Sequence, residues 1–295
     1  MEETIEQFIS FIRDIKHVSE NTLISYKRDL IKMSSYFIKQ GITSPDKINS
    51  TNINTYILWL EKNGQAASTI SRYIAAMKSY FHYLLQTGRI SSEPTTLVKA
   101  PNVAKKVPCV LTIEEINGLL SQPSSDNNKG IRDKAMLELM YATGMRVTEL
   151  ISLKVSDINF QLGYVVCKDA NKERIIPFGT PAKNALNEYM EIARNNMIKG
   201  TSEETLFVNC SGNPLSRQGF WKIIKQYAEQ AGIDGKITPH TIRHSFALHL
   251  VENGANLYAV QEMLGHSTVS STQVYAEMKG TRLRDEYTKN HPRIG

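Results

Sequence analysis

Apolar residues recur every three to four positions through the first part of the chain, which is the spacing of one face of an α-helix. Four such stripes lie within residues 3–16, 19–41, 51–64 and 68–88. Polar residues suited to helix N-caps precede the later stripes, with Thr51 or Asn52 and Ser68 or Thr69 as the expected starts. No alternating strand pattern occurs before residue 100, so this part is expected to be an all-helical bundle.

The second part of the chain mixes helical stripes with short β-branched segments. Thr112 and Glu115 have the spacing of a capping box, and an apolar helix over residues 133–141 is expected to end at Gly144. Residues 121–130 are polar and are expected to form a surface loop. Residues 163–168 and 174–178 resemble the two strands of a hairpin with Lys172 near its tip, and residues 206–208 are a further strand candidate. The remaining stripes predict helices over residues 181–198, 216–231, 239–252 and 256–264.

The segment between these parts has prolines and no helical period, which is typical of a linker. The expected domains are therefore a helical bundle over residues 1–90, a linker over 91–110 and a second domain over 111–295. The fold class is mainly α, with a small antiparallel β-sheet in the second, mostly helical domain.

Composition excludes several classes of protein. A chain of 295 residues suggests two domains, and no stretch approaches the ~20 apolar residues of a membrane span. Residues 1–20 mix acids and bases, unlike a signal peptide. Cys109, Cys167 and Cys210 form no CxxC pair, which favours free thiols in a reducing cytoplasm. The net charge of +6 is compatible with phosphate contacts but also with plain solubility.

The stretch from Thr238 to Ser245 has the densest candidate chemistry. Thr238 suits an N-cap and Pro239 suits the first helical position, so a helix is expected to begin here. The free N–H groups at such a helix start attract phosphate, and His240 and Arg243 share a face. Taken alone, the segment fits a phosphate grip and an ordinary polar start of a core helix equally well.

Other motifs change that balance. Arg146 lies in Ala-Thr-Gly-Met-Arg-Val-Thr-Glu-Leu, Lys172 in Asn-Lys-Glu-Arg, and Leu264-Gly265-His266-Ser267 precedes Tyr275. This ordered set resembles the tyrosine recombinase (site-specific integrase) family, and its wording is similar to that of the Xer recombinases of bacteria and archaea. The resemblance covers nearly the whole chain.

The resemblance implies a role for each matched residue. Arg146 and Arg243 would grip the scissile phosphate, because a planar and permanently charged fork suits bidentate phosphate contacts. Tyr275 would be the nucleophile, with His240 as its acid/base partner. Lys172 would protonate the leaving 5′-oxygen, and His266 would donate a hydrogen bond to a phosphate oxygen. Glu149 would orient Arg146, and His244 would have a structural role. His249 is expected at a surface or packing position.

The resemblance also implies how the protein meets DNA. Residues 19–36 and 68–85 are similar to the DNA-contacting helices of the family's SAM-like core-binding domain. The basic residues expected near DNA are Lys27, Arg28, Arg72 and Lys78. The implied partners are a double-stranded recombination site and other protomers in a ring of four on two DNA sites, with a second Xer-type protomer and a DNA translocase as further candidates. The segment from Thr281 to Gly295 is expected to dock on a neighbouring protomer. No cofactor, metal or membrane is implied.

Alternative functions remain open at this stage. His240 and His244 are spaced as in zinc helices, which would suit a metal hydrolase, although no H-E-x-x-H motif is present and Arg243 would repel a cation. A DNA-binding regulator without catalysis is a second alternative. Among recombinases, resolution of chromosome or plasmid dimers at cell division competes with a minimal transposon or phage integrase.

Overall fold

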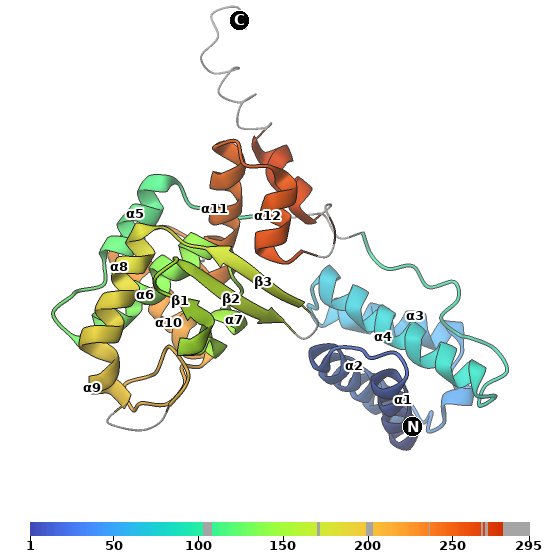
Figure 1. Cartoon of the computed structure of the whole chain (residues 1–295). Helices are drawn as coiled ribbons and strands as arrows, with labels where there is room; N and C mark the ends of the chain where they lie inside the picture. Colours follow the sequence, from blue (N-terminus) through green and yellow to red (C-terminus); the bar gives the residue numbers. More distant parts are fainter. Residues whose placement is uncertain are drawn as a thin grey trace, which may run out of the picture. The chain divides into compact units, whose positions relative to one another are not determined.

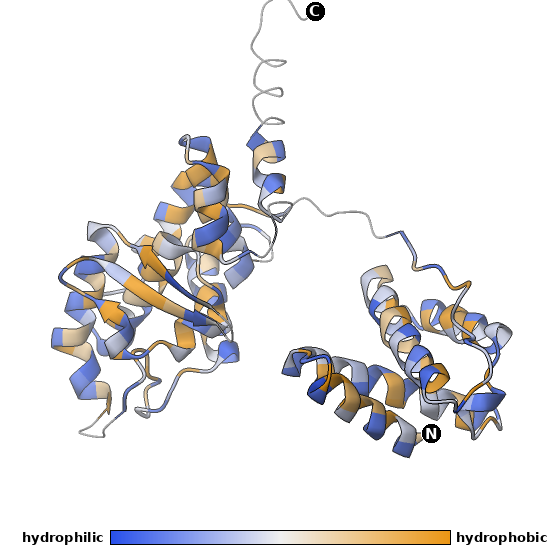
Figure 2. Ribbon diagram, turned by 45° about the vertical axis from the view of Figure 1, so that its right-hand side comes forward, coloured by the Kyte–Doolittle hydropathy of each residue, from blue (hydrophilic) through white to orange (hydrophobic). Residues whose placement is uncertain are grey.

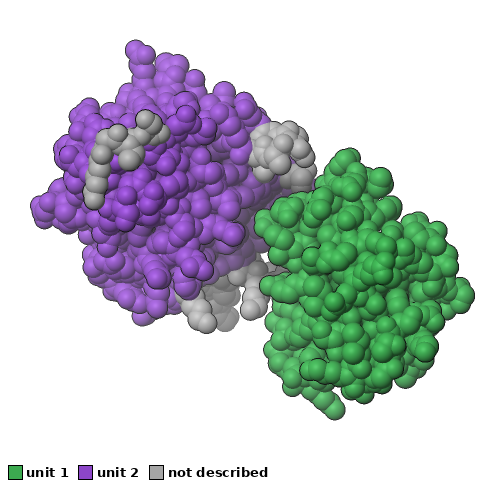
Figure 3. Space-filling view, turned by 90° about the horizontal axis from the view of Figure 1, so that it is seen from below, with its two compact units in different colours: residues 1–105 green, residues 106–295 purple. Residues whose placement is uncertain are grey.

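The computed structural model describes residues 1–102, 108–169, 172–198, 203–235, 237–266, 268 and 271–279. The chain forms two compact units, Met1–Lys105 and Lys106–Gly295, which Figure 3 colours separately. The division falls inside the segment expected to be a linker. Val98, within that segment, packs into the core of the first unit.

The first unit is helical, and no strand occurs among residues 1–102. Its elements are α1 (Glu2–Asp14), α2 (Glu20–Lys39), the 3₁₀ turn η1 (Pro45–Lys47), α3 (Ser50–Lys62) and α4 (Ala67–Gln86). Each α-helix buries most of the apolar stripe expected from the sequence, but Ile15, the last apolar residue of the first stripe, follows α1 and is 67% exposed. Figure 2 shows hydrophobic and hydrophilic residues side by side on these helices. The predicted bundle is confirmed.

Two predicted helix starts in this unit are wrong by one or two residues. α3 begins at Ser50 because Asn49 caps it, accepting a hydrogen bond from the Asn52 backbone N–H. α4 begins at Ala67 without any side-chain cap. Its start is therefore set by burial of the apolar face rather than by a local polar signal.

The second unit combines helices with one small sheet (Figure 1). Its first helices are α5 (Ile113–Ser121), α6 (Asn128–Thr143) and α7 (Val147–Ser152). The 3₁₀ turn η2 (Val155–Asp157) leads into β1 (Ile158–Asn159), β2 (Tyr164–Asp169) and β3 (Lys172–Pro177), which pair antiparallel in the order β1-β2-β3. The helices that follow are α8 (Thr180–Glu188), the π-helical turn η3 (Tyr189–Arg194), α9 (Asn195–Ile198), α10 (Arg217–Gln230), α11 (Pro239–Glu252) and α12 (Leu257–Leu264). The predicted fold class is confirmed.

Local signals in this unit predict several boundaries correctly. Thr112 and Glu115 form the expected capping box of α5. Gly144 ends α6 in a left-handed conformation with φ 58°. The strand expected over residues 206–208 is wrong, because only isolated bridges form there, from Thr205 to Lys154 and from Val208 to Pro214. The loop expected over residues 121–130 is shorter, since α6 already begins at Asn128 with Asn127 as its cap.

A small separate core lies at the end of the described chain. Residues 271–279 are helical, and Tyr275 packs there with Phe246 and Val251 of α11 and with Val260 and Leu264 of α12. This cluster places Tyr275 beside the helix that begins at Thr238. None of the helices that the structure describes is long and apolar enough to cross a membrane.

Candidate active site

Arg243 is held inside the second unit by two backbone oxygens. Thr238 caps α11, accepting a hydrogen bond from the Thr241 backbone N–H, and Pro239 takes the first helical position as expected. Arg243 is 5% exposed. Its Nη1 donates to the Gly144 carbonyl at 2.6 Å and its Nη2 to the Leu264 carbonyl at 2.6 Å. Burial and the nearby Arg146 charge lower the pKa of Arg243 to about 10, so its guanidinium stays charged at neutral pH.

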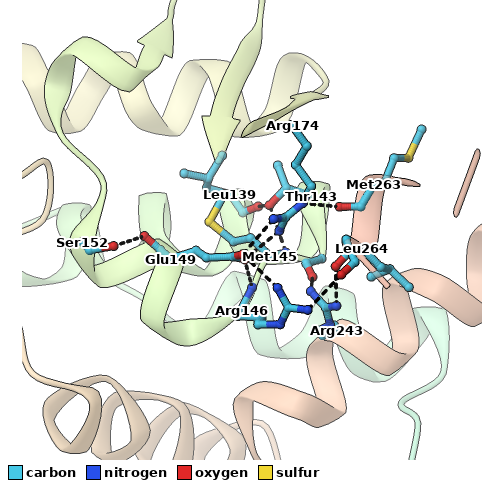
Figure 4. Close-up of polar contacts among 12 residues, drawn as sticks. Leu139, Thr143, Met145, Arg146, Glu149, Ser152, Arg174, Arg243, Met263 and Leu264 are labelled. Carbon is cyan, nitrogen blue, oxygen red and sulfur yellow. Dashed lines mark hydrogen bonds and ion pairs between the residues drawn. The ribbon is translucent and has the colours of Figure 1, made fainter. Parts of the chain in front are cut away.

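Arg146 lies beside Arg243 because Gly144 turns the chain there. The left-handed residue ends α6, and Arg146 becomes the N-cap of α7. Its Nη2 donates to the Gly265 carbonyl at 3.0 Å, next in the chain to the carbonyl that Arg243 binds. The structure therefore brings together two guanidinium groups from positions far apart in sequence (Figure 4). Such a pair can hold the two non-bridging oxygens of one phosphodiester.

Glu149 joins this pair, as the sequence suggested, but it has a second partner that the sequence did not indicate. Its carboxylate accepts from the Arg146 backbone N–H at 2.6 Å and from Arg146 Nη1 at 3.1 Å. It also accepts from Arg174 Nη1 at 2.8 Å and Nη2 at 2.7 Å. Burial raises the pKa of Glu149, but the hydrogen bonds from Arg174 and Arg146 outweigh it and the net pKa is lowered. Glu149 is therefore ionised at neutral pH.

The inward position of Arg174 follows from the register of the hairpin in the folded protein. Arg174 pairs in register with Cys167, which is fully buried, so this position of β3 faces inward. A charged residue at an inward strand position needs a buried partner. The partner could not be identified from the sequence, because Glu149 belongs to a different element.

Tyr275 contacts a histidine other than the expected one. Its hydroxyl oxygen lies 2.7 Å from Nδ1 of His244. Burial raises the pKa of Tyr275, and Arg243 only partly opposes this, so the phenol keeps its proton. Burial, and then the neighbouring His240 and Arg243, lower the pKa of His244 to about 4. Both partners are thus neutral at neutral pH.

His240 lies on the first turn of α11 with its side chain exposed. Its ring centroid is 6.4 Å from that of His244. The structure brings His244 to the Tyr275 hydroxyl, and it leaves His240 at the surface of the helix start. His249 is buried rather than at the surface, and it binds the Tyr141 hydroxyl at 2.9 Å and the Leu111 carbonyl at 3.0 Å.

His266 directly follows Gly265, which ends α12 with φ 64°. Among the described residues, the next helical stretch is 271–279. Nδ1 of His266 lies 3.0 Å from the Thr272 hydroxyl. Burial, and then Arg243 and Arg146, lower the pKa of His266 to about 4. Where Nδ1 accepts from Thr272, Nε2 carries the proton and can donate to a phosphate oxygen.

Lys172 begins β3 and pairs in register with Asp169, at the hairpin position expected from the sequence. Its side chain lies outside what the structure describes. The segment from Thr281 to Gly295, expected to dock on another protomer, also lies outside the described residues.

Among the described residues, no group of three or more His, Cys, Asp or Glu side chains is arranged to hold a metal ion.

The four basic residues expected near DNA differ in their surroundings. Arg72 forms a bidentate pair with the buried Asp29, from Nε at 2.7 Å and Nη2 at 3.0 Å, so it stabilises the first unit. Lys27 pairs with the partly exposed Glu6 at 2.6 Å. Arg28 is well exposed on α2, whereas Lys78 is half-buried on α4.

Two family models match this chain. The model of the phage integrase family matches residues 110–282, and the model of the phage integrase N-terminal SAM-like domain matches residues 5–88.

Two named relatives match nearly the whole chain. The tyrosine recombinase XerD of Staphylococcus haemolyticus is 45% identical over 99% of this chain and 100% of that protein. The tyrosine recombinase XerD of Halalkalibacterium halodurans is 46% identical over 98% of this chain and 97% of that protein.

Solved structures agree with the fold. The crystal structure of XerA recombinase is 27% identical, with a TM-score of 0.56 over 99% of this chain and 98% of that one. The XerH site-specific recombinase, bound to its palindromic difH substrate in a post-cleavage complex, is 22% identical, with a TM-score of 0.78 over 98% of this chain and 84% of that one. Because the identity to XerH is only 22%, this similarity shows a shared fold and nothing more.

Proposed function

Since this chain belongs to the phage integrase family and its similar members are tyrosine recombinases, it is a site-specific DNA recombinase, and we propose that Tyr275 is its nucleophile. One observation carries the assignment of the site. Arg146 and Arg243 bind the adjacent carbonyls of Gly265 and Leu264, while the Tyr275 hydroxyl binds His244 on the same helix as Arg243. A phosphate grip and a phenol thus converge on the start of α11.

In this proposal the Tyr275 oxygen attacks the scissile phosphorus. A 3′-phosphotyrosyl ester forms, and the bond from phosphorus to the 5′-oxygen breaks, with that oxygen leaving as a hydroxyl. The ester preserves the energy of the phosphodiester, so a 5′-hydroxyl can later attack it and rejoin a strand without ATP. Arg146 and Arg243 stabilise the charge that grows on the equatorial oxygens of phosphorus.

Two protons must move during the cleavage step. A phenol with a raised pKa does not ionise unaided at neutral pH, so His240, exposed at the start of α11, takes the Tyr275 proton when the hydroxyl leaves His244. Lys172 protonates the leaving 5′-oxygen from the end of the β-hairpin. His266 donates a hydrogen bond from Nε2 to a non-bridging phosphate oxygen.

The finer role rests on the comparisons. Full-length similarity to two proteins named XerD favours Xer-type recombination over a transposon or phage integrase. We therefore propose a double-stranded recombination site and other recombinase protomers as partners, in a ring of four on two sites. In this proposal the protein resolves chromosome or plasmid dimers at cell division. It acts in the cytoplasm, with a second Xer-type protomer or a DNA translocase as a further partner.

The covalent intermediate provides a test that also reveals the target site. Fragmented, nicked DNA from the source organism is incubated with the protein, denatured, and depleted of DNA that is not covalently bound. We expect retained DNA to share one sequence, and mass spectrometry of the digested adduct to place a nucleotide on Tyr275. Retention of no DNA above a heat-inactivated control would contradict the proposed function, and a nucleotide on another side chain would contradict the choice of nucleophile.

A further inference from the structure

Three arginine side chains bind three consecutive carbonyl oxygens at the end of α12 (Figure 4). Arg174 Nε donates to Met263 at 2.9 Å, Arg243 Nη2 to Leu264 at 2.6 Å, and Arg146 Nη2 to Gly265 at 3.0 Å. The last carbonyls of a helix have no partner within the helix and carry the negative end of its dipole. They therefore offset part of the repulsion among the three guanidinium groups.

Arg174 differs from the other two because its guanidinium is directed at a carboxylate. Its side chain is 10% exposed, and both of its terminal nitrogens donate to Glu149. The same carboxylate accepts two hydrogen bonds from Arg146. One buried negative charge is thus shared between Arg174 and Arg146.

The sharing affects how Arg146 can meet a phosphate. A carboxylate and a phosphate compete for the same guanidinium, since both are bidentate anions. If Arg174 were absent, the whole charge of Glu149 would act on Arg146 in a site where burial weakens solvent screening. Arg146 would then be held more tightly to Glu149 and would bind the phosphate less well.

We propose that Arg174 is a positioning residue of the recombinase, which balances Glu149 so that Arg146 stays available to the scissile phosphate. This inference rests on the proposed function. The same side chain also fixes the chain just before His266 through its bond to Met263. Because Arg174 lies two positions after Lys172 in β3, it connects the strand that begins with Lys172 to Arg146 through the shared Glu149 carboxylate.

The backbone at Gly265 leaves room for the Arg174 guanidinium. Gly265 adopts φ 64°, and a Cβ atom added there would lie 3.1 Å from Arg174 Nη1 and 3.2 Å from its Cζ. The glycine therefore provides the left-handed end of α12 and also the space that the guanidinium occupies.

The test compares Arg174→Ala, Arg174→Lys and Glu149→Gln with the double variant Glu149→Gln, Arg174→Ala. The captured target sequence, made as a nicked duplex that traps the adduct, reports the single-turnover rate of adduct formation, and gel shifts report affinity. We expect Arg174→Ala to slow adduct formation by roughly 10²-fold, because misplacing a catalytic group costs about that much. The affinity for DNA should fall only slightly, since one phosphate contact among many is weakened. Arg174→Lys should be intermediate, since lysine cannot form the bidentate pair.

The double variant separates positioning from simple structural support. The Glu149→Gln substitution removes the charge that holds Arg146, so adding it to Arg174→Ala should restore the rate at least about tenfold, part of the loss expected from misplacement. Glu173→Ala, at an exposed position of the same strand, is the matched control and should keep the wild-type rate. Thermal melts check that each variant is folded.

Each outcome bears on one idea. A double variant no faster than Arg174→Ala, or a wild-type rate in Arg174→Ala, would overturn the positioning role. If Arg174→Ala does not fold, the same comparison is made with Arg174→Lys, with and without Glu149→Gln. Failure of the wild-type protein to form any adduct would instead count against the proposed function.

Discussion

The Tyr275 hydroxyl oxygen lies 2.7 Å from Nδ1 of His244. Tyr275 is 1% exposed and belongs to an apolar cluster with α11 and α12. A phosphodiester of duplex DNA cannot enter such a cluster, since burying its charge would be costly. In the proposed reaction, the phenol therefore has to leave His244 and move outward before it attacks phosphorus.

Replacing Tyr275 with phenylalanine should abolish the covalent adduct. The ring remains to fill the cluster, and the lost hydrogen bond to His244 should reduce the free energy of unfolding by only about 1 kcal/mol. Adduct formation on the nicked duplex and gel-shift affinity are the two measurements. Tyr258→Phe, at an exposed position of α12, is the control and should retain full activity. An adduct formed by Tyr275→Phe would show that another residue is the nucleophile.

Separate substitutions of the two histidines distinguish their roles. We expect His240→Ala to slow adduct formation by about 10²–10⁴-fold, the usual contribution of a general base. His244→Asn keeps a polar group beside Tyr275 and should slow it less than about tenfold, within the range expected for one hydrogen bond. The rates are measured at saturating DNA. The reverse order would identify His244, the residue already in contact with the hydroxyl, as the proton acceptor.

The proposed leaving-group role of Lys172 can be tested with a duplex that carries sulfur at the 5′-bridging position. Lys172→Ala should slow cleavage strongly, and a duplex with sulfur at the 5′-bridging position should restore the rate, because a thiolate leaves without protonation. Lys168→Ala is the matched comparison on the same hairpin. Lys168 Nζ pairs with Asp157 at 2.6 Å, which gives it a structural role. Rescue of Lys168→Ala but not of Lys172→Ala would transfer the leaving-group role to Lys168.

Gly144→Ala should destabilise the second unit more than an alanine at an open left-handed position. Gly144 has φ 58°, and a Cβ there would lie 2.2 Å from Phe246 Cδ1. The strain of the left-handed backbone costs about 1 kcal/mol and overpacking adds about 1–3 kcal/mol. Gly232→Ala, with φ 64° and no atom within 4 Å of the added Cβ, should show the strain alone.

Urea unfolding of these two variants is followed in a Trp59→Phe background, which leaves Trp221 as the single tryptophan reporter of the second unit. Because the Gly144 carbonyl accepts from Arg243, Gly144→Ala should also slow adduct formation. Equal unfolding midpoints for the two alanine variants would contradict the predicted contact with Phe246.

The second unit should lose stability as the pH falls from about 6.5 to about 4. His244 and His266 each have a pKa lowered from 6.5 to about 4, mainly by burial. In that window the unfolded chain binds more protons than the folded one, so the free energy of unfolding decreases with falling pH and is fully retained above it. Melting temperatures across the window measure this, and His266→Asn should show a shallower decline. An unchanged slope would indicate that His266 is already protonated in the folded protein.

Local bonding explains what the sequence by itself determined. Thr238 caps α11 through the Thr241 backbone N–H, Thr112 and Glu115 form a capping box, and Gly144 ends α6. Each of these signals involves atoms within about four residues, so it can be identified without the rest of the chain. The apolar stripes likewise determine which face of each helix is buried, and together they determine the mainly helical fold class.

The tertiary structure alone decided the partners within the site. Arg174 pairs with Glu149 across 25 residues, and Tyr275 meets His244 rather than His240 across 31 residues. Residues 206–208 are apolar enough for a strand, yet the fold offers them a buried position with only isolated bridges. Such contacts depend on how whole elements pack against one another. A buried charge or hydroxyl needs a partner and binds the one that the packing brings within hydrogen-bonding distance. The spacing of residues along the chain does not determine that partner.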